Sequence, residues 1–213
     1  MSTHRILSLN IGDPEPMEWK GKTIVSSMRK HSVPGPLVVH VDSIVGNTFA
    51  QPEFHGAPHS VLYAFGLKSA LEFTTALGLD SYEPGTTGET ITLDELDEFE
   101  VSVGDRFRFG SVLAEVSYPR IPCGKVNFRM QHERGQKAMQ ECGRSGIYFR
   151  ILEPGKIAIT DKVQRVDRAK HTLLVSDVYR IIVKAEKPTP EIVELAKKNA
   201  ALPKRILEKW SAV

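Results

Sequence analysis

The chain of 213 residues has few of the features that mark a membrane, secreted or disulfide-bonded protein. Its two cysteines, Cys123 and Cys142, are too few for a disulfide framework and suit a reducing compartment such as the cytoplasm. No apolar run approaches the roughly 18 residues that span a membrane. The first residues lead into a strand-like segment without the apolar core of a secretion signal. We therefore expect a cytoplasmic protein without membrane partners.

The chain also lacks a strong excess of charge of either sign. Lys and Arg number 28 and Asp and Glu number 26, which gives a formal net charge of +2. Basic residues are frequent between residues 120 and 150, but no stripe of aromatic residues accompanies them, which argues against a nucleic-acid polymer as partner. The same basic residues fit either a solvated face or a pocket for one small anion such as phosphate.

Several motifs of catalytic and cofactor chemistry are missing as well. No His/Cys pair has the spacing of a zinc site, no Ser-His-Asp arrangement stands out, and no flavin, haem or iron–sulfur motif is present. A redox activity would therefore need electrons from a separate reductase.

Short apolar segments separated by turn residues dominate the first three quarters of the chain. Helical spacing is limited to residues 66–77, with Gly78 as a stop, and to residues 134–142. This pattern predicts a mostly β fold, either a barrel or a folded-over sheet. We predict strands at 5–11, 23–28, 36–41, 147–152 and 157–166, and a hairpin at 106–116.

The last quarter changes to three short amphipathic segments. Ser176 is a candidate cap for the first helix, Thr189 is the N-cap of the second, and the third lies in 202–210. Helices this short cannot each bury a face alone, so we expect them to pack as one small bundle. The predicted organisation is a β-barrel domain at 1–168 and a three-helix domain at 169–213.

The segment 119–125 places a thiol, Cys123, between a proline and a glycine. A proline stiffens the backbone before Cys123, and a glycine leaves it free afterwards. Arg120 and Lys125 flank the thiol and would favour its thiolate form, which attacks electrophiles or binds a soft metal. The alternative is a buried cysteine that packs as a small hydrophobe in a Pro-Gly turn.

Four pieces of sequence can be considered together. They are His55-Gly56-Ala57-Pro58, Gly88-Glu89-Thr90-Ile91-Thr92, Pro119-Arg120-Ile121-Pro122-Cys123 and Gly143-Arg144-Ser145-Gly146-Ile147. Their order and spacing, together with the helical tail, resemble the MOSC family, the module at the C-terminal end of molybdenum cofactor sulfurases. The chain looks most like its YiiM-like branch, which ends in a three-helix domain, and the resemblance covers nearly the whole chain.

The resemblance implies a MOSC-type β-barrel that carries a molybdopterin-bound molybdenum. It implies Cys123 as the single protein ligand of the metal, and a thiolate is the ligand that suits such a soft site. It further implies reduction of small N-hydroxylated substrates, such as hydroxylaminopurines and amidoximes, with electrons from a separate reductase. We take Cys123 and His55 as the candidate catalytic residues.

The phosphate of molybdopterin needs N–H groups, hydroxyls and cations around it. Other readings stay open, since Lys30 and Arg120 would serve as surface charges and Glu89 as the brace of a turn. His55 would serve equally as a core histidine. The candidate cofactor-binding residues are Lys30, Thr87, Glu89, Thr90, Thr92, Arg120 and Lys125.

The chain departs from the family pattern at five positions. Ala57 stands where a second glycine follows His-Gly, which puts a positive φ there in doubt. Asn47, Gln51 and His59 stand where family members have aspartates. The lost carboxylates make the expected pocket less acidic, which would either alter substrate preference or abolish binding. Thr90 stands in place of an asparagine.

Two other functions remain open from the sequence. The first is a carrier of sulfur or cofactor, in which Cys123 holds a persulfide without turnover. The second is an interaction module whose helical tail docks a redox partner or a second copy, which would make a homodimer. Pyridoxal phosphate, used by the other half of the sulfurases, has no recognisable lysine motif here, and we do not expect it.

Overall fold

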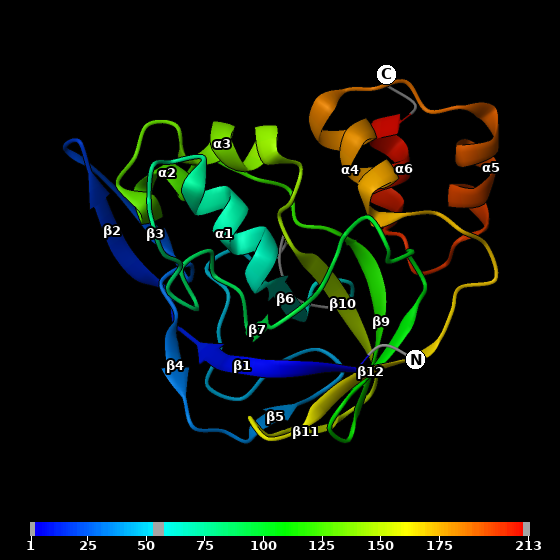
Figure 1. Cartoon of the computed structure of the whole chain (residues 1–213), viewed down its shortest axis with the longest axis horizontal. Coiled ribbons are helices and arrows are strands. Elements are labelled where there is room, and N and C mark those ends of the chain that lie inside the picture. Colours follow the sequence, from blue (N-terminus) through cyan, green and yellow to red (C-terminus); the bar gives the residue numbers. More distant parts are fainter. Residues whose placement is uncertain (1–2, 53–57, 211–213) are drawn as a thin grey trace.

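Seven strands of the computed structural model close into a barrel, which lies below two groups of helices in the view of Figure 1. The structure describes residues 3–52 and 58–210. The strands follow the order β12-β8-β9-β10-β6-β7-β1, and β1 pairs back with β12 to close the ring, which confirms the predicted β-barrel. Within the ring the β6–β7 pairing is parallel. The strands are β1 (Thr3–Ile11), β6 (Leu62–Gly66), β7 (Ile91–Leu93), β8 (Arg106–Phe109), β9 (Val112–Pro119), β10 (Ile147–Glu153) and β12 (Lys162–Asp167).

Shorter strands attach to the ring or stand beside it. The turn between β2 and β3 has positive φ at Lys20 and Gly21, which matches the primed turns that two-residue hairpins favour. The segment expected to give the last strands, 157–166, is divided by a turn in which the Asp161 N–H bonds back to the Ala158 carbonyl at 3.0 Å. The shorter strands are β2 (Glu15–Trp19), β3 (Lys22–Ser26), β4 (His31–Val33), β5 (Leu37–Val39) and β11 (Gly155–Ile157).

Aromatic rings fill the interior of the barrel. Phe149 of β10 meets Phe107 and Phe109 of β8 edge to face, with ring centroids 5.7 and 5.3 Å apart. Alternate residues of β8 are buried in this way while its arginines face outward, as expected for a strand with one core face. Edge-to-face packing of this kind stabilises a core beyond the area that it buries.

Three helices cover one side of the barrel next to the β2–β3 hairpin (Figure 1). α1 (Leu67–Thr75) and α3 (Gly135–Cys142) lie where the apolar spacing predicts helices, and α2 (Lys125–Met130) was not predicted because six residues show too little periodicity. A separate apolar cluster holds these helices to the hairpin. It includes Met17, Met28, Phe73, Val126 and Met139.

Three further helices form the C-terminal part of the chain: α4 (Val175–Lys184), α5 (Pro190–Lys198) and α6 (Lys204–Trp210). Thr189 caps α5 as predicted, by accepting a hydrogen bond from the Ile192 N–H. The prediction for Ser176 was wrong, since α4 begins earlier and has Leu174 at its N-cap position. Apolar residues of this tail belong to the same buried cluster as the barrel core. The division into two domains at residue 168 stays a prediction.

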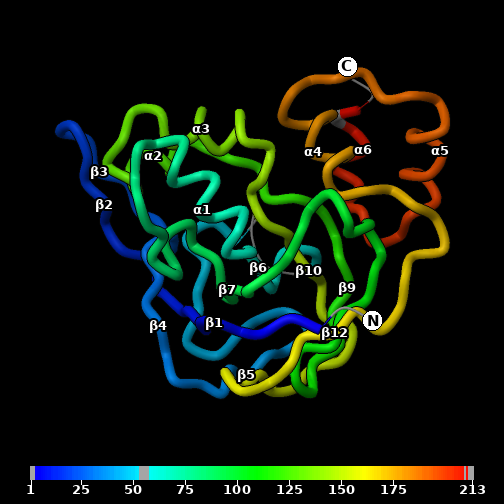
Figure 2. Tube along the Cα trace, in the orientation of Figure 1, coloured from blue at the N-terminus to red at the C-terminus, as the bar shows by residue number. Residues whose placement is uncertain are grey.

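The path of the chain brings distant segments together around the barrel. In Figure 2 the first strand crosses the barrel and reaches β12, beyond which the chain rises into the helical tail. None of the helices in the described ranges is long and apolar enough to cross a membrane.

Candidate functional site

One pocket, about 640 Å³ with its open mouth included, lies where the barrel meets the hairpin and the helices. Its walls combine apolar surface with hydroxyls, two buried cations and one thiol. The lining residues come from segments far apart in sequence, namely 26–30, 49–51, 60–63, 87–90 and 120–125, and from Tyr148 of β10.

Cys123 lies in the wall of this pocket as a free, partly exposed thiol. The loop that carries it runs from the end of β9 to the start of α2. The Cys123 carbonyl accepts a hydrogen bond from the Val126 N–H at 3.0 Å, and the Gln136 side chain of α3 donates to the Pro122 carbonyl at 3.3 Å. These two bonds fix the backbone of the loop, and the Cys123 side chain lines the pocket.

Arg120 places a buried positive charge in the same wall. The residue is 5% exposed, and its guanidinium donates to the Met139 sulfur at 2.8 Å and lies 5.7 Å from the centre of the Tyr63 ring. No carboxylate forms an ion pair with it within the described part of the chain. A buried cation without a counter-charge is unfavourable, which makes this position attractive to an anion.

Lys30 is the second buried cation of the pocket. Its Nζ donates to Thr90 Oγ1 at 2.8 Å. Burial lowers the pKa of Lys30 to about 7, although the nearby Glu89 carboxylate acts in the opposite direction. Since an adjacent negative charge favours the ammonium form, an anion in the pocket would restore the full charge of this side chain.

Glu89 and Thr92 lie behind the wall and do not line the pocket. The Glu89 carboxylate is fully buried and accepts hydrogen bonds from Tyr82 Oη at 2.7 Å, Gly85 N at 2.6 Å and Thr92 Oγ1 at 2.9 Å. It also accepts from Thr87 Oγ1 at 2.9 Å. This carboxylate therefore organises the loop that presents Thr87 to the pocket, in line with the reading of Glu89 as a brace.

The approach of this loop to the hairpin depends on Gly88. Its φ is +84°, a value that side chains with a Cβ rarely adopt, and a Cβ there would lie 3.1 Å from the Met28 side chain. Glycine thus lets the Thr87 segment lie directly against the Met28 segment, so both form one wall.

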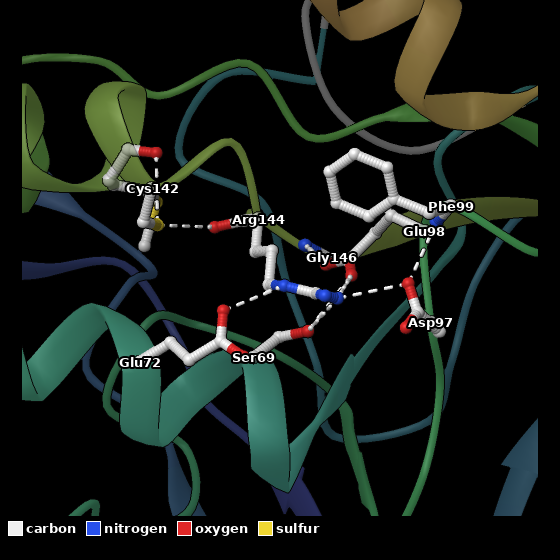
Figure 3. A network of polar contacts seen from close by, with 9 residues as sticks. Ser69, Glu72, Asp97, Glu98, Phe99, Cys142, Arg144 and Gly146 are labelled. Carbon is white, nitrogen blue, oxygen red and sulfur yellow. Dashed lines mark hydrogen bonds and ion pairs between the residues drawn. The ribbon is translucent and has the colours of Figure 1, made fainter.

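A network of polar contacts around Arg144 lies outside the pocket and holds the start of the segment that leads into β10 (Figure 3). Arg144 forms ion pairs with Glu72 at 2.8 Å and with Asp97 at 2.9 Å. The next residue, Ser145, donates its hydroxyl to the Arg120 carbonyl at 2.6 Å, and its own carbonyl accepts from Tyr63 Oη at 2.7 Å. Arg144 therefore fixes the loop that positions two residues of the pocket.

The remaining sequence candidates have different positions. Lys125 lines the pocket and donates to the Gln51 side chain, whereas His55 and Ala57 lie outside the described residues. His59 is turned towards the tail, where its Nδ1 is 3.1 Å from the Ala201 carbonyl.

Sequence reasoning assigned no role to Tyr63, Tyr148 or Ser60, which all line the pocket. Tyr63 and Tyr148 are cross-strand partners of β6 and β10, with ring centroids 5.1 Å apart. Burial raises the pKa of both phenols, so they remain protonated. Tyr148 directly follows one quoted motif and Tyr63 lies five residues after another, but only the strand register shows that they meet.

A barrel whose pocket combines a free thiol with two buried cations fits a protein that binds an anionic, soft-metal group. A family model described as the MOSC domain matches residues 51–164, which is more than half of the chain. The chain belongs to the MOSC family, whose domains are associated with the molybdenum cofactor.

Within this family the chain is related to YiiM. It is 31% identical to protein YiiM of Escherichia coli over 157 residues, which cover 72% of this chain and 66% of that protein. It is 26% identical to the uncharacterized protein YflK of Bacillus subtilis over 178 residues, 84% of this chain and 80% of that one. A protein of Gibberella moniliformis named reductase is 28% identical over 165 residues, 76% of this chain, but the match spans only 29% of that longer protein.

Solved structures show the same fold. YiiM from Geobacillus stearothermophilus superposes with a TM-score of 0.79 at 24% identity and covers 98% of both chains. YiiM from Escherichia coli superposes with a TM-score of 0.70 at 23% identity, over 93% of this chain and 90% of that one. At 98% coverage of this chain, the match to the Geobacillus stearothermophilus structure includes the helical tail as well as the barrel.

Proposed function

We propose that this protein binds a molybdenum cofactor in the pocket and reduces N-hydroxylated compounds such as hydroxylaminopurines and amidoximes. The observation that carries the proposal is the meeting of one free thiol with two buried cations, Lys30 and Arg120, in a single pocket. The family and its relatives support cofactor association, and the reductase name of one relative supports redox chemistry.

The residues of the pocket fit the parts of such a cofactor. The Cys123 sulfur would be the protein ligand of the metal, since a thiolate suits a soft centre. Lys30 and Arg120, with the hydroxyls of Thr87 and Thr90, would hold the phosphate. No group of three or more metal-binding side chains exists among the described residues, so a metal at Cys123 would take its other ligands from a bound group.

When bound, the cofactor would supply two-electron transfer to the substrate. The overall reaction consumes two electrons and two protons, breaks the N–O bond and releases water with the amine. We expect the electrons from a separate reductase. The chain itself contributes binding and orientation, because the uncharged side chains of Tyr63 and Tyr148 lie in the pocket wall and present their rings to a ligand.

Cys123→Ser protein tests this proposal against wild-type protein and against Cys142→Ser. Cys142 is the matched control because it is also a free, half-buried cysteine but does not line the pocket. All three are produced in a host that makes the cofactor, and molybdenum content and hydroxylaminopurine reduction are measured. We expect Cys123→Ser to lose most of its molybdenum and its activity while Cys142→Ser keeps both. Undiminished reduction by Cys123→Ser contradicts the proposal.

The partly exposed Cys123 thiol also supports a second candidate, a sulfur carrier that holds a persulfide. Mass spectrometry of aerobically grown protein separates the two functions. A carrier shows about one extra sulfur mass on the Cys123 peptide without substrate turnover, whereas a reductase turns over with the unmodified thiol.

A further inference from the structure

The helical tail reaches the pocket through a chain of hydrogen bonds. Arg205 of α6 donates from Nη2 to Tyr118 Oη at 2.5 Å, and its guanidinium lies 5.4 Å from the centre of the same ring. Tyr118, near the end of β9, donates to Ser60 Oγ at 3.0 Å. Ser60 stands just before β6 and lines the pocket. Tyr118 is 2% exposed and Ser60 is 3% exposed, so the chain runs through the interior.

The chemistry of these groups gives the chain one direction. A guanidinium has only donors, so Tyr118 Oη must accept from Arg205. Burial raises the pKa of Tyr118, so the phenol keeps its single hydrogen, and that hydrogen goes to Ser60. Ser60 Oγ thereby accepts, and its own hydrogen must be donated elsewhere. In the part of the chain that the structure describes, the Ser60 hydroxyl makes no second hydrogen bond.

We propose that Arg205 is a positioning residue that, through Tyr118, makes the Ser60 hydroxyl a hydrogen-bond donor to an anionic oxygen of the ligand. This inference rests on the proposed function only in one respect, namely that the ligand is an anion. The buried positive charges of Lys30 and Arg120 favour such a ligand. Without Arg205, the Tyr118 and Ser60 hydroxyls can exchange the roles of donor and acceptor. Ser60 can then donate to Tyr118, and donating the Ser60 hydrogen to the ligand instead would break that hydrogen bond.

Binding of inorganic phosphate at pH 6.5 tests the proposal by isothermal titration calorimetry. The full-length variants are Ser60→Ala, Arg205→Met and the double variant, each checked by thermal unfolding. We expect Ser60→Ala to weaken binding by about tenfold or more, as for a lost hydrogen bond to a charged group, and Arg205→Met by a smaller factor. In the Ser60→Ala background, Arg205→Met should cause no further loss, because both changes act through one hydroxyl.

Tyr118→Phe provides a second route if Arg205→Met folds poorly. It breaks the hydrogen-bond chain but keeps the ring, whose centroid lies 5.1 Å from that of Tyr148, and it should match Arg205→Met. The proposal is overturned if Arg205→Met and Tyr118→Phe both bind phosphate with wild-type affinity. It is also overturned if Arg205→Met weakens phosphate binding equally in the wild-type and Ser60→Ala backgrounds, or if wild-type protein does not bind phosphate. Molybdenum loss in Cys123→Ser is measured separately, so the reductase function can fail while this inference stands.

Discussion

Replacing Lys30 by methionine should stabilise the fold and weaken anion binding at the same time. The pKa of this buried lysine falls from 10.5 to about 7 because of burial. Each unit corresponds to about 1.4 kcal/mol, so the buried ammonium destabilises the folded state by up to about 5 kcal/mol. Methionine keeps the length of the side chain and removes the charge. Loss of the hydrogen bond to Thr90 removes about 1 kcal/mol of this gain, which leaves a net stabilisation of up to about 4 kcal/mol.

The gain should depend on pH in a defined direction. Below pH 7 Lys30 carries its proton in both the folded and the unfolded state, and the whole burial penalty is present. Between pH 7 and 10.5 the unfolded chain binds more protons than the folded protein, so wild-type stability rises with pH. The advantage of Lys30→Met over wild type is therefore largest near pH 6 and shrinks towards pH 10.

Urea unfolding of both proteins at pH 6, 8 and 9.5 measures this difference, because other titrating groups are common to the two. Lys22→Met is the matched control, since Lys22 is an exposed lysine of the nearby strand β3. It should change stability by less than about 0.5 kcal/mol at every pH. A Lys30→Met protein less stable than wild type at pH 6, or a difference that does not change with pH, refutes the reasoning.

Two further predictions concern the charges around the pocket. The affinity for phosphate should fall as the pH rises above 7, because binding requires protonated Lys30. The fall should be at most tenfold per pH unit. Calorimetry should show this pH dependence in wild type and not in Lys30→Met. Glu89→Gln should lower the free energy of unfolding by about 2–4 kcal/mol, because an amide NH₂ replaces an oxygen that accepts from buried donors. Thermal unfolding beside the exposed control Glu95→Gln checks this, and equal stability of the two variants would contradict it.

Local patterns were enough to predict much of the fold. The alternation of the strands, the apolar spacing of α1 and α3 and the Thr189 cap all involve residues that are close together in the sequence. The elements predicted from these local signals are present in the structure. The six-residue α2 and the break at Ala158 are too short to leave a periodic signal. Ser176 has the chemistry of a cap, but α4 begins earlier, at Val175, where the N–H groups of Val175 and Ser176 bond to the carbonyls of Val101 and Glu98.

The candidate site depended more on long-range structure. The pocket brings together Cys123, Arg120 and Lys30, which the sequence proposed on resemblance and on charge. Glu89 lies behind the wall because its carboxylate is used inside its own loop, which spacing alone cannot reveal. Ser60 was missed because its role depends on strand register and on contacts with the distant tail.

The ring closure between β1 and β12 has a consequence for synthesis. Arg5 pairs with Lys162, so this half of the β1 edge has no partner until almost the whole barrel has been translated. At ordinary elongation rates that wait is on the order of ten seconds. The part of the β1 edge that stays unpaired during this time is Thr3-His4-Arg5, and all three of these residues are polar or charged. Such residues disfavour the pairing of an exposed edge strand with another chain. We therefore expect this unpaired edge to be less prone to join another nascent chain than an apolar edge of the same length.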